Sequence, residues 1–234
     1  METLQPVGPD EQLLAQGEYD YQLSGKRSGL TEAWSLHRLP EGDYIHRATV
    51  GGRISRLRIK QTSHFVLTPQ YRPNRLEMRQ DIDGDITHST ILCQPTTVEQ
   101  SIVREDGSEH KTFEVPAGYA LFFPPVSAQG FILQSYDPTL GGRQPLSLVS
   151  VRVQPENNLP LAIDLQTIDY EQVNHQEEIE TPAGQFRSYH FIRYDHHMEQ
   201  HLWLDDLQVV LQWSVPYSPI MKWEYLLTRY QRKG

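Results

Sequence analysis

Residues 18–50 read EYDYQLSGKRSGLTEAWSLHRLPEGDYIHRATV, and large apolar side chains recur in them at every second position. Tyr19 and Tyr21 share one face of an extended chain, and Trp34 and Leu36 repeat the pattern after the turn GKRSG. The segment PEGD then turns the chain again. Two-residue alternation interrupted by turns of this kind predicts meandering β-hairpins.

The same period continues outward as far as Tyr230. In DIDGD, residues 81–85, an Asp-Gly pair between two strand patterns predicts a tight hairpin, because the calcium-loop pattern that it begins fails at Leu92. Many short strands at near-regular spacing predict an all-β fold, an antiparallel curved sheet or incomplete β-barrel. Further strands are expected in RISRLRIK, SHFVLT, NRLEMRQ, ITHSTILC, VEQSIVR, KTFEV, PLSLVSVRVQP, LAIDLQTIDYEQV, GQFRSYHFIRY, HLWLDD, LQVVLQWSV and KWEYLLTRY.

Two short helices are expected beside these strands. Asp10 is a suitable N-cap for a helix over residues 11–16, because its side chain can accept a hydrogen bond from a free backbone N–H. In PPVSAQGFILQSYDP the alternation stops, and Ser127 can cap a helical turn or two that end before Asp137 and Pro138. The fold class is therefore all-β with one short helix in the middle of the chain.

Composition bounds the class of protein. Of the 234 residues, 38% are hydrophobic and 10% aromatic, which is enough to bury a sizeable core and excludes disorder over most of the length. No linker and no repeat of fixed period divides the chain. We expect a single β-barrel-like domain over residues 1–234, in which residues 1–16 form an N-terminal extension or short helix.

Charge and targeting features limit the classes of partner and the cellular location that we expect. The formal charge is −9 and the 21 Lys and Arg residues are scattered along the sequence, which argues against a nucleic acid partner. Residues 1–16 hold neither a basic residue nor the apolar run of a signal peptide, and no segment is long enough for a membrane span. The single cysteine, Cys93, excludes an internal disulfide. We expect a cytoplasmic protein, with its oligomeric state left open.

The densest group of candidate metal ligands lies in RSYHFIRYDHHMEQHLWLDD, residues 187–206. On a hairpin, His190 lies on one face with Ile192 and Tyr194, His197 lies in the loop, and His201 opens the return strand facing the same way as Trp203. Imidazole is a ligand that divalent zinc, iron and nickel prefer, so these three histidines are candidates for a metal site. Their spacing matches no known signature, and a structural or surface role is the favoured interpretation, with no cofactor expected.

Two further patterns indicate where a ligand would bind. In RISRLRIK, Arg56, Arg58 and Lys60 alternate with apolar residues and form a stripe on one sheet face. Such a stripe holds a carboxylate or phosphate if it lines a barrel interior, and is an ordinary polar face if it meets solvent, which is the commoner arrangement. Aromatic side chains at alternate positions normally form core, but on a curved sheet they also line grooves. The candidate ligand-binding residues are Trp34, Arg56, Arg58, Phe131, His190, Trp203 and Trp213.

The last quarter of the chain carries a family resemblance. The run ETPAGQFRSYHFIRY, residues 180–194, is followed by HLWLDDLQVVLQW and a closing strand WEYLLTRY. This layout, with a T-P-A-G-x-F turn from Thr181 to Phe186, resembles a bacterial domain-of-unknown-function family of β half-barrels. The curved sheet with a central helix is also similar to the lipoprotein-localisation carriers. The resemblance implies a sheet that clasps an apolar ligand, and it implies no catalytic residues.

Three functions remain open from the sequence. The leading hypothesis is a binding protein that holds a hydrophobic or amphipathic small molecule, lipid-like or pigment-like, in an aromatic-lined groove. The alternative is an enzyme that uses His190, His197 and His201 with a metal or as acid and base. A third hypothesis is a protein-interaction module that pairs through a sheet edge. The chain lacks G-x-S-x-G, C-x-x-C, H-E-x-x-H, G-x-G-x-x-G and P-loop motifs, which removes support from the commonest enzyme classes.

Overall fold

The computed structural model describes residues 7–54, 56–154, 159–195, 198–218 and 220–233. Their secondary structure is almost entirely strand, with a single 3₁₀ helix among the described residues. The elements are β1 (Gln12–Leu23), β2 (Lys26–Arg38), β3 (Tyr44–Ile54), β4 (Leu57–Leu67), β5 (Pro73–Ile82), β6 (Asp85–Cys93), β7 (Thr97–Arg104), β8 (Gly107–Glu114), β9 (Ala120–Phe122), η1 (Val126–Ser135), β10 (Arg143–Gln154), β11 (Leu159–Thr181), β12 (Gly184–Asp195), β13 (Met198–Leu204), β14 (Val210–Ser218) and β15 (Met221–Arg232).

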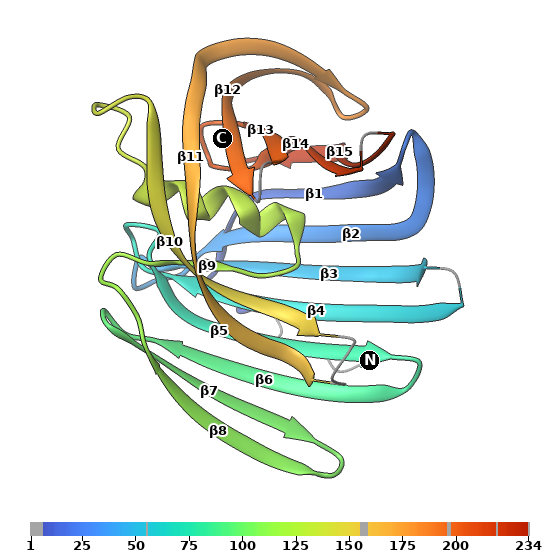
Figure 1. Cartoon of the computed structure of the whole chain (residues 1–234), viewed down its shortest axis with the longest axis vertical. Coiled ribbons are helices and arrows are strands. Elements are labelled where there is room, and N and C mark those ends of the chain that lie inside the picture. The colour runs from blue at the N-terminus through green and yellow to red at the C-terminus, as the bar shows by residue number, and fades with distance from the viewer. Residues whose placement is uncertain (1–6, 55, 155–158, 196–197, 219, 234) are drawn as a thin grey trace.

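All described strands belong to one curved sheet in the order β8-β7-β6-β5-β4-β3-β2-β1-β15-β14-β13-β12-β11-β10-β9 (Figure 1). Neighbours are antiparallel, except that β9 pairs with β10 in parallel. β1 pairs with β15, so two arms, β1–β8 and β9–β15, meet at the centre of the sheet. The sheet stays open, with β8 and β9 as its edges. The predicted all-β curved sheet with one short helix is therefore confirmed.

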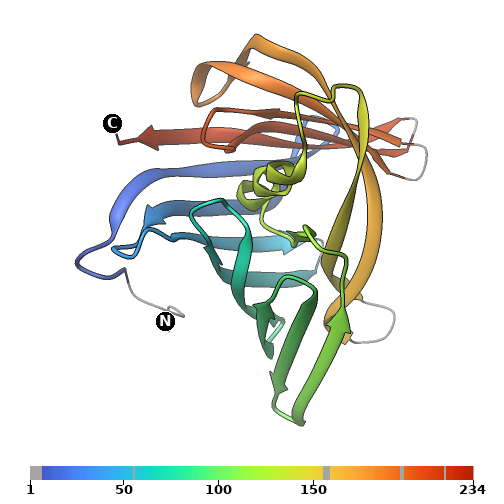
Figure 2. The same ribbon diagram turned by 90° about the vertical axis from the view of Figure 1, so that its left-hand side faces the viewer.

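The core fills the concave face of this sheet, where η1 lies between the two arms (Figure 2). Phe131 and Ile132 of η1 are almost fully buried. Phe65 of β4 meets Phe123 edge-to-face at 5.0 Å, and Phe131 lies 5.6 Å from the His46 ring. Aromatic contacts of this kind stabilise a core beyond the area that they bury. The helix is thus an internal element and not a cover over an open side.

Buried polar groups fix the N-terminal end of η1. The Glu32 carboxylate accepts hydrogen bonds from the backbone N–H of Val126 at 2.7 Å, the N–H of Ser127 at 3.0 Å and the Tyr21 hydroxyl at 2.6 Å. Burial raises the pKa of this carboxyl, and the three donors oppose that rise. His46 Nε2 lies 2.8 Å from the Ser127 hydroxyl. Glu32 therefore satisfies the free N–H groups that begin every helix.

The predicted helix over residues 11–16 is wrong, because β1 begins at Gln12. Ala15 and Gly17 point into the core at alternate positions, and a Cβ on Gly17 would lie 3.0 Å from the Trp34 ring. Because both residues are small, no large apolar side chain marks the inward face here. The two-residue period of a strand is therefore not apparent in the sequence. Ladders to β2 and β15 override the local preference for a capped helix.

The predicted single strand RISRLRIK is also wrong, because β3 ends at Ile54 and β4 begins at Leu57. Arg56 lies in the turn between them, so the predicted stripe keeps only Arg58 and Lys60 in a strand. Gly52 lies inside β3, so the turn comes later in the chain than a strand beginning at Arg53 implies. A Cβ on Gly52 would lie 1.9 Å from the Gly29 carbonyl oxygen, so this glycine permits a close approach inside the ladder.

Other local predictions are confirmed. Asp83 and Gly84 both have positive φ between β5 and β6, as a tight hairpin requires. Thr181 and Gly184 flank the turn between β11 and β12, and the Thr181 hydroxyl accepts a hydrogen bond from Ala183 N–H. The helix at Ser127 exists, but Pro125 occupies the N-cap position without a side-chain bond. The capping role expected of Ser127 belongs to Glu32.

Candidate ligand-binding groove

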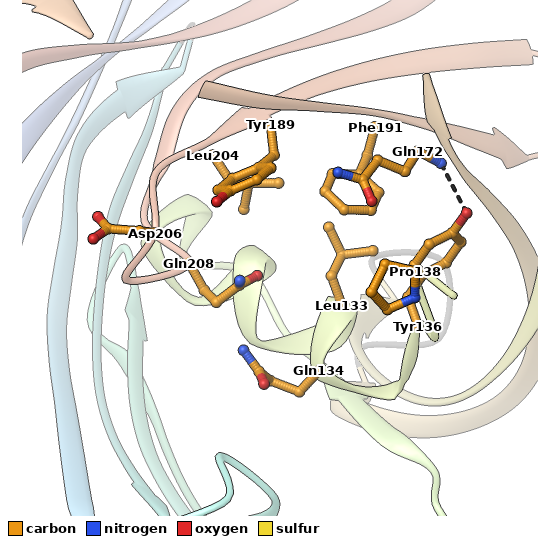
Figure 3. A pocket seen from close by; sticks show the side chains of 10 residues that line it. All are labelled: Leu133, Gln134, Tyr136, Pro138, Gln172, Tyr189, Phe191, Leu204, Asp206 and Gln208. Carbon is orange, nitrogen blue, oxygen red and sulfur yellow. Dashed lines mark hydrogen bonds between the residues drawn. The ribbon is translucent and has the colours of Figure 1, made fainter. Parts of the chain in front are cut away.

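A groove of about 460 Å³ lies beside the C-terminal end of η1 (Figure 3). One wall is the inner face of β11, β12 and β13, and the other is η1 with the chain that follows it. The turn after β13 closes one end. Six lining residues are apolar or aromatic, namely Leu133, Tyr136, Pro138, Tyr189, Phe191 and Leu204. Four are polar, namely Gln134, Gln172, Asp206 and Gln208.

Tyr136 ties the end of η1 to the sheet. Its ring meets Phe191 edge-to-face at 5.4 Å. Its hydroxyl donates a hydrogen bond to the Gly142 carbonyl at 2.8 Å and accepts one from the Gln172 backbone N–H at 3.2 Å. Because Tyr136 is buried and satisfied on both sides, it forms a fixed wall of the groove.

The turn after β13 is held by Asp205. Its carboxylate accepts hydrogen bonds from the backbone N–H groups of Leu207 and Val209, both at 2.9 Å. This arrangement places Gln208 at a positive φ of 63° with its carbonyl oxygen against η1. A Cβ on Gly130 would lie 1.8 Å from that oxygen, so only glycine lets the helix sit so close to the turn.

The polar groups of the groove are mostly neutral. Asp206 is the one charged residue in the lining that the structure describes, and it already forms a two-point ion pair with Arg232 at 2.6 and 3.1 Å. Hydrogen bonding to this guanidinium lowers the pKa of the Asp206 carboxyl. Gln208 Oε1 is buried and has no hydrogen-bond partner within the described part of the chain. The groove therefore offers apolar walls and neutral amide side chains.

Three of the predicted ligand-binding residues lie in the core. Trp34, Phe131 and Trp213 are 6%, 5% and 7% exposed. Trp34 stacks on His46 with ring centroids 6.2 Å apart, and Trp213 contacts Tyr225 at 5.1 Å. None of the three lines the groove. Their role in binding stays a prediction, and their observed contacts are those of packed core.

His190, His201 and Trp203 lie together on the outer face of β12 and β13, and the common orientation of His201 and Trp203 is as predicted. His190 Nε2 is 3.0 Å from His201 Nδ1, and His190 stacks on Trp203 at 4.5 Å. His190 Nδ1 is 3.4 Å from Glu177, which also accepts a hydrogen bond from the Trp203 indole. Burial lowers the pKa of His190, although the Glu177 carboxylate opposes this. This face is opposite to the groove.

The predicted metal set is incomplete in the part of the chain that the structure describes. His197 lies outside the described residues. Among the residues that are described, no group of three or more His, Cys, Asp or Glu side chains is arranged to hold a metal ion. His190 and His201 instead share a hydrogen bond, which uses one nitrogen of each ring.

Arg56 and Arg58 occupy the hairpin between β3 and β4, far from the concave face. Both are exposed. The Arg58 backbone N–H donates to Asp83 at 2.8 Å, and its guanidinium lies 3.7 Å from Asp81. The seven predicted ligand-binding residues thus lie in three separate places, and these described residues are absent from the groove lining.

Sequence reasoning missed the residues that do line the groove. Tyr189 and Phe191 alternate with His190 on β12, so their common inner face was readable from the two-residue period. The opposite face of β12, which carries His190, was predicted as the site instead because its side chain is ionisable. Tyr136 and Gln208 had no comparable signal, since their position depends on where η1 and the turn after β13 meet.

The comparisons with known proteins identify the fold. No protein-family model and no curated protein matches the sequence. A β-barrel-like protein of the domain-of-unknown-function family DUF1849 from Brucella abortus aligns with TM-score 0.60 and 7% identity, covering 95% of this chain and 99% of that one. A DUF1089 family protein from Pseudomonas aeruginosa aligns with TM-score 0.52 and 10% identity, covering 81% of this chain and 90% of that one. The chain shares the fold of β-barrel-like proteins of domain-of-unknown-function families.

Proposed function

We propose that this protein binds a neutral amphipathic small molecule in the groove between η1 and strands β11–β13. The observation that carries the proposal is the groove itself, whose 460 Å³ falls in the size range of small-molecule sites. Its apolar walls, chiefly Tyr189, Phe191 and Leu133, contact the apolar part of the ligand. This assigns the predicted binding role to a part of the concave face that the helix leaves unfilled.

The polar residues support a ligand without negative charge. Among the described residues the lining holds no Lys, Arg or His, and its one carboxylate, Asp206, is already paired with Arg232. An anionic head group would be desolvated there without a cation to balance it, which is costly. The neutral amide side chains of Gln134, Gln172 and Gln208 are instead suited to hydrogen bonds with a ligand hydroxyl or amide. A neutral pigment or lipid alcohol fits this chemistry better than a fatty acid.

Titration with the neutral fluorescent dye Nile red tests the proposal. The variant Gln134→Trp places a large side chain at the exposed edge of the groove, and we expect it to weaken dye binding about tenfold or more. The matched control is Leu140→Trp, because Leu140 is 74% exposed and does not line the groove. Native mass spectrometry of the purified protein identifies any ligand that remains bound.

Two results would overturn the proposal. Nile red fluorescence that does not rise with wild-type protein removes the binding role of the groove. Equal dye affinity in Gln134→Trp and Leu140→Trp places the dye elsewhere on the molecule. Matching thermal melting curves for both variants and the wild type show that the comparison is made between folded proteins.

A further inference from the structure

Three hairpin tips lie side by side at one end of the sheet. The Ser24 N–H of the β1–β2 tip donates to the Lys222 carbonyl of the β14–β15 tip at 2.8 Å. On its other side, β2 pairs Leu30 with Gly52 just before the β3–β4 tip. Figure 1 shows these three turns along its right-hand side. We call this surface, made of the described residues at the three tips, the hairpin rim.

The hairpin rim gathers positive charge on an acidic protein. The chain as a whole has a formal charge of −9, yet the tip sequences 24–27, 53–58 and 217–222 contain no Asp or Glu. Residues that are scattered along the sequence therefore meet in space. Arg27, Arg58 and Lys222 have acidic neighbours, but their side chains are still 81%, 59% and 54% exposed. The six cations of the rim are Lys26, Arg27, Arg53, Arg56, Arg58 and Lys222.

The same tips expose large apolar side chains. Ile220 is 88% exposed, Tyr217 66% and Leu57 50%, and Ile54 and Met221 are each 36% exposed. Clustered exposed apolar side chains mark interaction surfaces, because each gains free energy when it leaves water. The next tip, between β5 and β6, carries Asp83 and Asp85 and so bounds the rim on that side.

We propose that the hairpin rim docks onto the surface of an anionic lipid bilayer. Apolar side chains at protruding tips enter the boundary between head groups and acyl chains, while the surrounding cations meet lipid phosphate and carboxylate groups. A nucleic acid would use the cations but leave Ile220, Tyr217 and Leu57 in water. The described part of the chain contains no helix with the length and hydropathy of a membrane span.

Cosedimentation with lipid vesicles tests this docking. We expect the full-length protein to pellet with phosphatidylcholine vesicles that contain about 30 mol% phosphatidylserine, and to release when salt is raised from about 0.1 to about 0.5 M. The double variant Arg53→Glu with Arg56→Glu replaces two rim cations by carboxylates, and its binding should weaken at least about thirtyfold, since loss of each cation alone contributes about a fivefold effect. Ile220→Ser should weaken binding about threefold or more.

Matched controls separate the rim from overall charge. Arg38→Glu with Arg72→Glu changes the net charge equally, but these exposed arginines lie at the opposite ends of β2 and β4. Leu140→Ser removes an apolar side chain that is 74% exposed away from the rim. Both controls should bind as wild type, and thermal melting confirms that all variants fold.

The docking proposal is overturned by any of three results. The wild type staying in the supernatant with anionic vesicles excludes a bilayer partner and leaves an acidic protein as the occupant. Equal binding to pure phosphatidylcholine vesicles excludes the role of the cations. Equal losses in the rim and control double variants show that net charge alone governs binding.

Discussion

The two ends of η1 meet the sheet in different ways. At the N-terminal end, Glu32 and His46 form buried hydrogen bonds to Val126 and Ser127. At the C-terminal end, Leu133 borders an open groove, and Tyr136 provides the polar tie to β11. The difference shows that several buried polar groups fix the beginning of η1, whereas the Tyr136 hydroxyl holds the chain after its end beside the groove.

A substitution that displaces η1 should have the largest effect on stability and on the groove at its C-terminal end. In Gly130→Ala the new Cβ would lie 1.8 Å from the Gln208 carbonyl oxygen and 2.5 Å from Leu204 Cδ2, so η1 must shift. Overpacking of this kind costs about 3 kcal/mol of the free energy of unfolding. Urea denaturation measures the loss, and Nile red titration should show the groove altered.

The control for this variant is Gly51→Ala. A Cβ there meets only the Ile59 carbonyl oxygen, at 3.8 Å, and Gly51 does not have a positive φ. A change of less than about 1 kcal/mol is expected. If Gly130→Ala were as stable as Gly51→Ala, the close contact between η1 and the turn after β13 would not constrain the helix.

The N-terminal anchor should make stability depend on pH. Burial, with a smaller contribution from His64, lowers the pKa of His46 from 6.5 to about 3. Because the folded protein keeps this imidazole neutral while the unfolded chain binds a proton below pH 6.5, stability is lost as the pH falls from 6.5 towards 3. The limiting slope is about 1.4 kcal/mol per pH unit.

Urea denaturation at about pH 7, 6 and 5 isolates this contribution when the wild type is compared with His46→Gln. The glutamine variant keeps a polar partner for Ser127 but does not titrate, so its free energy of unfolding should fall less on acidification. His64, whose pKa is lowered to about 4, is present in both proteins and cancels in the difference. Parallel curves for the two proteins would contradict the prediction.

The C-terminal tie should show the smallest effect. Tyr136→Phe removes the hydroxyl that donates to the Gly142 carbonyl and accepts from Gln172 N–H. We expect a loss of about 1 kcal/mol in the free energy of unfolding, the usual contribution of a buried hydrogen bond. Tyr217→Phe is the control, because Tyr217 is 66% exposed and its loss should be near zero. Equal values would mean that Tyr136 does not hold η1 to β11.

Much of the sheet was predictable because hairpins are local. Asp83 and Gly84 specify their turn by backbone preference alone, and the common face of His201 and Trp203 follows from the two-residue period. Predictions failed where contacts with residues distant in the sequence determine the local structure. Gln12–Gly17 became a strand because β15 and β2 flank it, and Gly52 stayed in a ladder because the Gly29 backbone approaches it.

The groove was beyond local reasoning for the same reason. Alternation shows that Tyr189 and Phe191 share a face of β12, but not that η1 covers this face only in part. That depends on the contact of Gly130 with Gln208, two residues from separate segments. The hairpin rim could not be predicted from the sequence either, because its cations come from three hairpins that are neighbours only through the order of strands in the sheet.

The pairing of β1 with β15 has a consequence for how the molecule is made. Tyr21 lies opposite Tyr225, so the central seam of the sheet joins segments from distant parts of the chain. During synthesis β1 leaves the ribosome long before β15, so one edge of β1 stays unpaired until β15 has been made. Contacts of such wide sequence separation slow folding and leave strand edges open to other chains. A nascent chain stalled before residue 221 would therefore lack the middle of its sheet.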